Sequence, residues 1–226
     1  MESGQDKEAI RTGTTVSLDN SQLLTFLDEN DTKVRILLAA ARLFANRGYA
    51  GTSVREIVAM AGVTKPTLYY YFKNKDDLCI KLMDLAMETY AKVLKEPLKQ
   101  PGNVRWRLAT LFSSLYAILR ANTDFLRFSY WAFYAPQGAI PPYDLTVAND
   151  YLRSTLEEIL QGGVTAGELR AEKVELVILL LTGLMRNMEE LLVINPTHPA
   201  INPSDLAAAI GLILDGARAP QGGDRP

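Results

Sequence analysis

Residues 51–78 read GTSVREIVAMAGVTKPTLYYYFKNKDDL, and the expected fold follows from this stretch. Ser53 and Glu56 have the spacing of a capping box, which satisfies the first free backbone N–H groups of a helix. Gly62 then ends that helix, and Thr64 can cap a second one that has a proline in its first turn. Two short helices joined by a tight turn predict a helix-turn-helix unit.

The second helix of this unit is expected to present a face of hydroxyl, aromatic and amino groups. The major groove of DNA accepts a helix, and such groups can then reach the edges of the bases. Neighbouring lysines and hydroxyls suit phosphate contacts, which fix the register without reading the sequence. The predicted face consists of Lys65, Thr67, Tyr69, Tyr70 and Tyr71, and the predicted phosphate contacts are Thr52, Ser53, Lys73 and Lys75.

The net charge of −2 conceals a basic segment. Residues 32–95 hold 11 basic and 5 acidic side chains, a net charge of +6, and the rest of the chain carries −8. A basic segment on an acidic body indicates that one part of the chain meets a polyanion and the other does not. Charge alone leaves chance clustering open. The acidic body argues against a sequence-blind nucleoid protein.

Composition narrows the class of protein further. The single cysteine, Cys79, excludes an internal disulfide. With only one histidine, His198, the chain also has too few ligands and catalytic groups for the usual metal sites and catalytic triads. The longest uncharged apolar stretch, 176–185, is about half of the roughly 20 residues that a membrane span needs. The polar N-terminus has no signal-peptide core. We therefore expect a cytoplasmic protein with no cofactor, no metal and no membrane contact.

Apolar residues recur at helical spacing along most of the chain, and no stretch alternates for long enough to predict a strand. The expected fold class is all-α, with nine or ten helices. Beyond the four helices expected around the helix-turn-helix unit, we expect helices at about 103–121, 123–135, 143–161, 171–194 and 204–217. The expected domains are a flexible extension (1–30), a helix-turn-helix domain (31–76), a helical ligand-binding and dimerisation domain (77–218) and a flexible tail (219–226).

The helix-turn-helix segment resembles the tetracycline-repressor (TetR) family of one-component bacterial regulators. The resemblance spans roughly residues 32–80 and rests on RGY at 47–49, TSV at 52–54, AGV at 61–63 and TLYYYFKNKDDL at 67–78. It implies a homodimer whose helix-turn-helix units enter successive major grooves of double-stranded operator DNA. It also implies a variable C-terminal domain that binds a small-molecule effector. By motif position, it implies DNA contacts by Arg55, Lys65, Pro66, Thr67, Tyr69 and Tyr71 and a phosphate contact by Lys75.

Several of these residues also have a purely structural interpretation. Phe72 is expected to hold the second helix of the unit against its neighbours, and Tyr69 can do the same. Arg55 can either grip a guanine or pair with a nearby acid on the surface. Thr64 is expected to be a helix cap first and a DNA contact second.

Residues 125–134, FLRFSYWAFY, hold six aromatic side chains in ten positions. Helical geometry spreads them over more than one face, so they cannot all fill one core seam. Each of them alone can still be a core residue. With aromatic and methionine residues of neighbouring helices they predict a cavity for a small, largely apolar ligand. The predicted ligand contacts are Trp106, Phe112, Tyr116, Arg127, Phe128, Trp131, Tyr134, Met185 and Met188.

The last two predicted helices carry apolar stripes that contain small residues. Such stripes bury well against a second copy in a four-helix bundle, and the TetR family dimerises through its last two helices. The alternative is that both stripes pack inside one protomer. The predicted interface consists of Leu180, Gly183, Leu184, Asn187 and Leu191 on the first helix and Leu206, Ala207, Ile210, Gly211 and Leu214 on the second.

The function that these observations favour is sequence-specific regulation of transcription, as a repressor that a small ligand releases from DNA. The sequence leaves an activator open as an alternative. An all-helical small-molecule enzyme is the competing class, but the sequence has no Gly-rich phosphate loop, no G-x-S-x-G and no H-E-x-x-H motif. We therefore expect no catalytic residues.

Overall fold

The structure is a computed structural model that describes residues 31–136, 138–194 and 202–218. Within these ranges it has nine α-helices, two short 3₁₀-helices and no strand, which confirms the all-α prediction. No helix in the described part of the chain is long and apolar enough to cross a membrane. The predicted extension (1–30), the predicted tail (219–226) and His198 lie outside the described residues.

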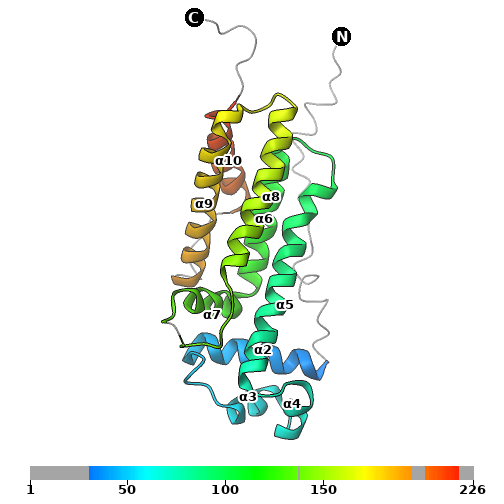
Figure 1. Cartoon of the computed structure of the whole chain (residues 1–226), viewed down its shortest axis with the longest axis vertical. Helices are drawn as coiled ribbons and strands as arrows, with labels where there is room; N and C mark the ends of the chain where they lie inside the picture. Colours follow the sequence, from blue (N-terminus) through cyan, green and yellow to red (C-terminus); the bar gives the residue numbers. More distant parts are fainter. Residues whose placement is uncertain (1–30, 137, 195–201, 219–226) are drawn as a thin grey trace, which may run out of the picture.

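The helix-turn-helix end lies at the bottom of Figure 1. The side chains of Asp31, Ser53, Thr64 and Asn74 each accept a hydrogen bond from the first turn of a helix, which confirms the caps predicted at Ser53 and Thr64. Gly62 ends one of these helices in the left-handed conformation, with φ of 63°. The elements of this end are α2 (Thr32–Arg47), α3 (Val54–Ala61), α4 (Lys65–Tyr71) and the start of α5 (Lys75–Lys95).

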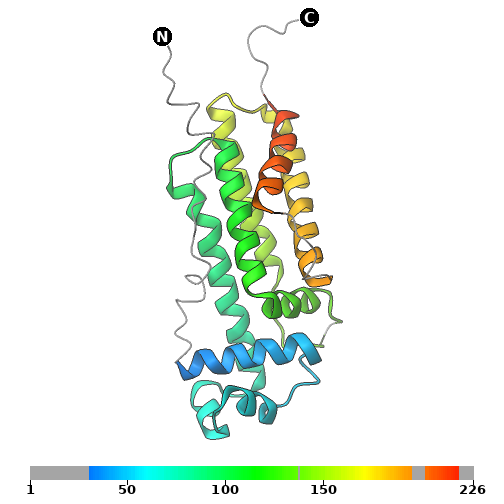
Figure 2. The same ribbon diagram turned by 180° about the vertical axis from the view of Figure 1, so that it is seen from behind.

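The rest of the chain forms a helical body above this end (Figures 1 and 2). Helices α5, α6, α8 and α9 run along the long axis, while α7 lies across the lower end of the body and packs on α2. The elements of the body are η1 (Glu96–Lys99), α6 (Val104–Ala121), α7 (Thr123–Tyr134), α8 (Thr146–Thr165), η2 (Ala171–Lys173), α9 (Val174–Ile194) and α10 (Pro203–Asp215).

Helix α8 differs from its predicted bounds. The expected end at the glycine pair after residue 161 is wrong, because the helix continues through both glycines to Thr165. A Cβ atom on Gly163 would lie 2.2 Å from the Val104 side chain of α6. This glycine therefore allows two helices to approach closely and does not terminate one.

Two hydrophobic cores divide the molecule. The upper core fills the body, and the lower core joins α2, α3, α4 and the start of α5 to α7. Phe44 of α2 lies at the centre of the lower core, with its ring centroid 5.1 Å from that of Phe128 on α7. Phe72 is fully buried in the same core, so its predicted role in holding α4 is confirmed.

Candidate nucleic-acid interface and ligand cavity

Helix α4 exposes an aromatic face. Leu68 is fully buried and anchors the helix, while Tyr70 is 83 % exposed, Tyr69 is 51 % exposed and Tyr71 is 38 % exposed. The rings of Tyr70 and Tyr71 meet edge to face, with centroids 4.9 Å apart. Lys65, Pro66 and Thr64 are exposed beside them, and Thr67 is half-buried. The structure therefore brings the predicted residues of α4 onto one end of the molecule.

The turn between α3 and α4 is fixed by an arginine of α2. Arg35 donates hydrogen bonds to the Ala61 carbonyl at 2.8 and 3.2 Å and to the Gly62 carbonyl at 3.1 Å. Carbonyls at the end of a helix have no partner inside that helix, so these bonds satisfy them. Sequence reasoning counted Arg35 only as a positive charge, and no local pattern distinguishes it from an exposed one.

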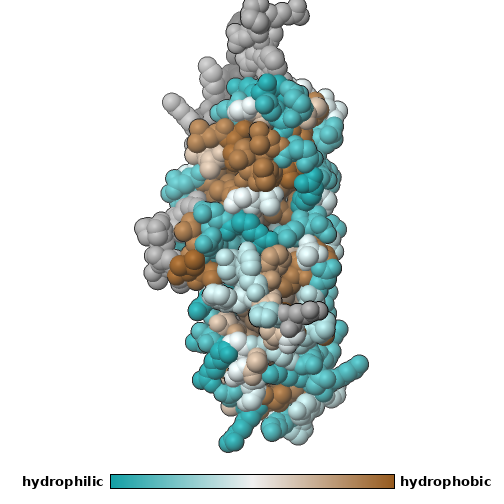
Figure 3. Space-filling view, turned by 60° about the vertical axis from the view of Figure 1, so that its left-hand side comes forward, coloured by the Kyte–Doolittle hydropathy of each residue, from teal (hydrophilic) through white to brown (hydrophobic). Residues whose placement is uncertain are grey.

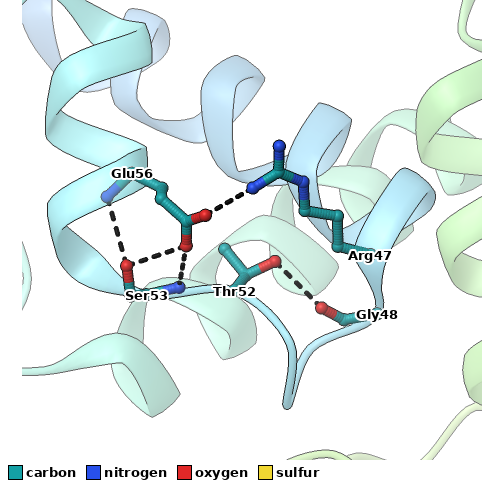
Figure 4. A network of polar contacts seen from close by, with 5 residues as sticks. All are labelled: Arg47, Gly48, Thr52, Ser53 and Glu56. Carbon is teal, nitrogen blue, oxygen red and sulfur yellow. Dashed lines mark hydrogen bonds and ion pairs between the residues drawn. The ribbon is translucent and has the colours of Figure 1, made fainter.

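The start of α3 carries a polar network (Figure 4). The Ser53 hydroxyl accepts a hydrogen bond from the Glu56 amide, and the Glu56 carboxylate accepts hydrogen bonds from the Ser53 amide and hydroxyl. These bonds to Ser53 are the main reason why the pKa of Glu56 is lowered, and an ion pair with Arg47 adds to the effect. Ser53 is therefore a cap whose side chain also lies at the surface.

The structure corrects two of the predicted phosphate contacts. Thr52 is buried, and its hydroxyl donates to the Gly48 carbonyl at 2.9 Å. The Lys75 ammonium donates to the Tyr49 and Thr52 carbonyls, each at 2.9 Å, and lies 4.1 Å from the centroid of the Tyr49 ring. Both side chains are thus engaged inside the protein, and Lys75 ties the loop before α3 to the start of α5.

Three cations near α4 remain available to a polyanion. Arg55, Lys65 and Lys73 are exposed, and none of them forms an ion pair with a described residue. The alternative in which Arg55 pairs with a surface acid therefore has no support in the described part of the chain. Thr64 accepts a hydrogen bond from the Thr67 amide, which is the capping role expected for it.

The two neighbouring lysines, Lys73 and Lys75, are expected to respond differently to removal of their charge. Lys73→Met should reduce the slope of log affinity against log salt by about 0.9, because one phosphate contact and its released counterion are lost. Lys75→Met should leave that slope unchanged and lower the free energy of unfolding by about 1–3 kcal/mol, because two carbonyls lose their donor. DNA binding at several salt concentrations and urea denaturation measure both quantities. An equal loss of slope in the two variants would contradict this assignment.

A cavity of about 180 Å³ lies between α2 and the body helices α5 to α9. Its walls are mostly apolar, and one wall is formed by Leu37, Leu38 and Ala41 of α2. Aromatic side chains line it from α5 and α7, and Arg186 and Glu189 of α9 lie at one side. The remaining part of the lining includes Tyr90, Phe125, Tyr130, Phe133, Leu145, Asn149, Leu152, Thr182 and Met185. No group of described acidic, histidine and cysteine side chains could hold a metal ion.

Most of the predicted ligand contacts do not line this cavity. Phe112, Tyr116 and Met188 are buried in the upper core, Phe128 is buried in the lower core, and Trp131 and Tyr134 face outward. Trp106 packs against Gly102, and Arg127 does not reach the cavity. Met185 is the one predicted contact that lines it. From the aromatic stretch, the side chains that line the cavity are Phe125, Tyr130 and Phe133, and Tyr90 of α5, which the sequence did not single out, also lines it.

The predicted dimer face is only partly exposed, and most of its residues on α10 are buried within the protomer. Leu206, Ile210 and Leu214 are buried, α10 packs mainly on α6, and a Cβ on Gly211 would meet the Arg105 side chain. These residues pack within the protomer because the apolar stripe of α10 faces α6, so the prediction is wrong for them. Ala207 is half-buried. On α9, Leu180, Gly183 and Asn187 are exposed, and Leu184 and Leu191 are half-buried.

An apolar surface does remain on this side of the molecule. Figure 3 brings the α9 and α10 side forward and shows apolar side chains gathered in its upper part. The exposed apolar residues of the two helices there are Leu176, Leu179 and Leu180 of α9 and Leu212 of α10. A contiguous exposed apolar surface of this kind is typical of a protein–protein interface.

Comparison with known proteins bears on the helix-turn-helix end and on the helical body. Residues 36–82 match the family model described as bacterial regulatory proteins, tetR family. The chain is 26 % identical over 148 residues to a fatty acid metabolism regulator protein of Bacillus subtilis, which covers 61 % of this chain and 70 % of that one. It is 26 % identical over 198 residues to the HTH-type transcriptional regulator YdgC of the same organism, covering 86 % and 96 % of the two chains.

A solved structure resembles the fold over most of the chain. The crystal structure of the Bacillus subtilis transcriptional regulator FadR in complex with stearoyl-CoA superposes with a TM-score of 0.59, covering 80 % of this chain and 95 % of that one. The two sequences are 24 % identical over this match. At this level of identity the likeness concerns the arrangement of the helices.

Proposed function

We propose that the chain is a member of the tetR family of bacterial regulatory proteins, whose model its residues 36–82 match, and that it is a repressor of transcription that a small, largely apolar ligand releases from operator DNA. The observation that carries the proposal is the exposed tyrosine face of α4, held on a buried core. Three neighbouring exposed aromatic side chains on one short helix are typical of a surface that binds a partner, and a helix of this kind fits the major groove.

The DNA-binding part of the proposal assigns distinct roles to the exposed side chains. We propose that base edges and thymine methyl groups are met by Tyr69, Tyr70 and Tyr71 together with Thr67. Ser53, Arg55, Lys65 and Lys73, which surround them, are proposed to contact phosphates, and Arg55 can also reach a guanine. Residues 31–76 are the proposed DNA-binding domain and residues 77–218 the proposed ligand-binding and dimerisation domain.

The cavity supports the ligand-dependent part of the proposal. Because α2 forms one of its walls, a ligand in the cavity contacts the DNA-binding end of the protein directly. A coupling of about 1–3 kcal/mol between the two sites would change operator affinity about 5- to 150-fold. The fatty acid metabolism regulator among its relatives and the stearoyl-CoA bound to the FadR structure favour a ligand that has an apolar chain.

We propose that two protomers act together. The exposed surface of Leu176, Leu179, Leu180 and Leu212 is the candidate contact, since it is the apolar face that α9 and α10 leave open. A symmetric dimer places two recognition helices about 34–36 Å apart, one turn of DNA. A regulator of this kind acts on the bacterial chromosome, so we propose a cytoplasmic location.

Selection from a random pool of double-stranded DNA tests the regulator proposal. We expect the protein to enrich a palindromic site, and sedimentation to find two protomers on each site. A reporter gene placed behind that site should be repressed, and increased expression would identify an activator instead. Binding of all sequences with equal affinity, or no binding at low salt, would overturn the proposal.

A further inference from the structure

Helix α2 lies between the helical body and the helices α3 and α4 (Figures 1 and 2). It packs against α7 of the body on one side and against α3 on the other. Leu37, Leu38 and Ala41 of α2 line the cavity, so an occupant of the cavity touches this helix directly. Packed helices respond to ligands by small sliding movements, and α2 is placed to make such a movement.

Arg35 connects α2 to the turn in front of α4. It is half-buried and lies three residues before Leu38 of the cavity wall. Its Nε and Nη2 donate to the Ala61 carbonyl at 3.2 and 2.8 Å, and Nη2 also donates to the Gly62 carbonyl at 3.1 Å. A guanidinium is a planar fork of donors, so it fixes both carbonyls in position relative to α2.

The turn that Arg35 holds leads directly into α4. Gly62 adopts the left-handed conformation with φ of 63°, and the amide after it donates to the Val58 carbonyl at 3.0 Å. Thr64 then accepts from the Thr67 amide and caps α4. Hydrogen bonds are directional, whereas apolar packing alone is not, so these bonds make the start of α4 follow the turn.

Helix α5 offers a competing connection, because it also lines the cavity and reaches the helix-turn-helix end. Its link to that end is Lys75, which donates to the Tyr49 and Thr52 carbonyls. These carbonyls lie in the loop before α3 and not in the turn before α4. The contact that reaches the start of α4 is therefore the one made by Arg35.

We infer that Arg35 is a positioning residue that couples the cavity to α4, because its guanidinium makes the turn before α4 follow α2 when an occupant of the cavity displaces that helix. This inference rests on the proposed function, in which the cavity controls operator binding. It is independent of the effector's identity, since any occupant that presses on α2 acts through the same contact.

An aromatic ring built into the cavity takes the place of the effector in the test. Ala148 of α8 lines the cavity, and Ala148→Phe adds a permanent occupant without altering α2 or the DNA-binding end. This variant should bind the selected operator at least about fivefold more weakly than the unaltered protein. Gln161→Phe, at an exposed position of the same helix, is the matched control and should stay within about twofold.

Removal of the guanidinium should abolish the effect of the ring. In the Arg35→Met background, Ala148→Phe should change operator affinity by less than about twofold, whereas the effects of independent substitutions would multiply. Lys75→Met is the matched control, since it also removes a cation that donates to two carbonyls, and the ring should keep its full effect there. Fluorescence anisotropy measures these affinities at one salt concentration, and urea denaturation shows that each variant is folded.

Two further measurements distinguish positioning from other roles of Arg35. Arg35→Met should leave the slope of log affinity against log salt unchanged, because the guanidinium donates to carbonyls. A decrease of about 0.9 would make Arg35 a phosphate contact and overturn the inference. Arg35→Gln, which is too short to span both carbonyls, should also abolish the effect of the ring, and it carries the test if Arg35→Met does not fold.

The outcomes separate this inference from the proposed function. An equal effect of the ring with and without Arg35 would overturn the inference and leave a DNA-binding regulator in place. An operator affinity that Ala148→Phe leaves unchanged would do the same, because α2 would then not respond to an occupant. Loss of the effect in Lys75→Met but not in Arg35→Met would assign the coupling to α5 and also overturn it. Failure to bind any selected DNA would instead overturn the proposed function.

Discussion

Replacing Tyr70 with alanine is expected to weaken binding to the selected operator by about 5- to 150-fold without unfolding the protein. A contact that reads a base is worth about 1–3 kcal/mol, and Tyr70 is the most exposed of the three tyrosines on α4. Because 83 % of the side chain is exposed, little packing is lost, and the free energy of unfolding should change by about 0.5 kcal/mol or less. Fluorescence anisotropy at one fixed salt concentration measures the affinity.

Tyr151→Ala is the matched control for this prediction. Tyr151 lies on α8 in the body, is 42 % exposed, and loses the same chemical group on substitution. The operator affinity of this variant should stay within about twofold of that of the unaltered protein, since Tyr151 lies on α8, away from the proposed DNA-binding surface of α4. If Tyr70→Ala and Tyr151→Ala bound the operator equally well, α4 would not be the recognition element.

Phe128→Ala is expected to lower the free energy of unfolding by about 3–5 kcal/mol, the usual cost of removing a buried aromatic ring. Phe128 is 3 % exposed and packs against Phe44 of α2 and Phe125 of its own helix, so its ring joins the body to the DNA-binding end. The sequence suggested a ligand contact for this residue. Urea denaturation decides between the two roles, because a ligand contact alone would leave much of the stability intact.

Trp131→Ala, three residues further along α7, supplies the comparison. The indole is 61 % exposed, so its removal should change the free energy of unfolding by less than about 1 kcal/mol. Both variants should unfold with the same dependence on urea concentration if each remains a two-state folder. A loss in Trp131→Ala as large as that in Phe128→Ala would mean that the lower core does not end where the structure places it.

Much of the fold could be predicted because its signals are local. A helix start depends on a cap within three residues, so Ser53 and Thr64 could be identified from the sequence alone. Phe72 could be assigned to the core because the motif places it on the inner side of α4. The second glycine after residue 161 was misread, since a glycine that ends a helix and one that lets helices approach look alike in sequence.

The site could be predicted less well because it depends on the arrangement of helices in space. The aromatic residues of α7 are spread around the helix, and only its position across the lower end of the body decides which of them face the cavity. Lys73 and Lys75 are equally basic in sequence, yet two carbonyls from a distant loop occupy one of them. An apolar stripe such as that of α10 shows that a face is covered, but not whether α6 or a second copy covers it.

The wall that Leu37, Leu38 and Ala41 contribute places the proposed effector cavity against α2, the helix on which α3 of the proposed DNA-binding unit packs. Reciprocity then requires that the operator weaken the effector by the same factor by which the effector weakens the operator. Protein bound to a strong operator would therefore need a higher effector concentration for release than protein bound to a weak one. Substitutions in α2 that shift the helices packed on it would change operator affinity and the induction threshold together, so selection could not tune the two properties independently through this helix.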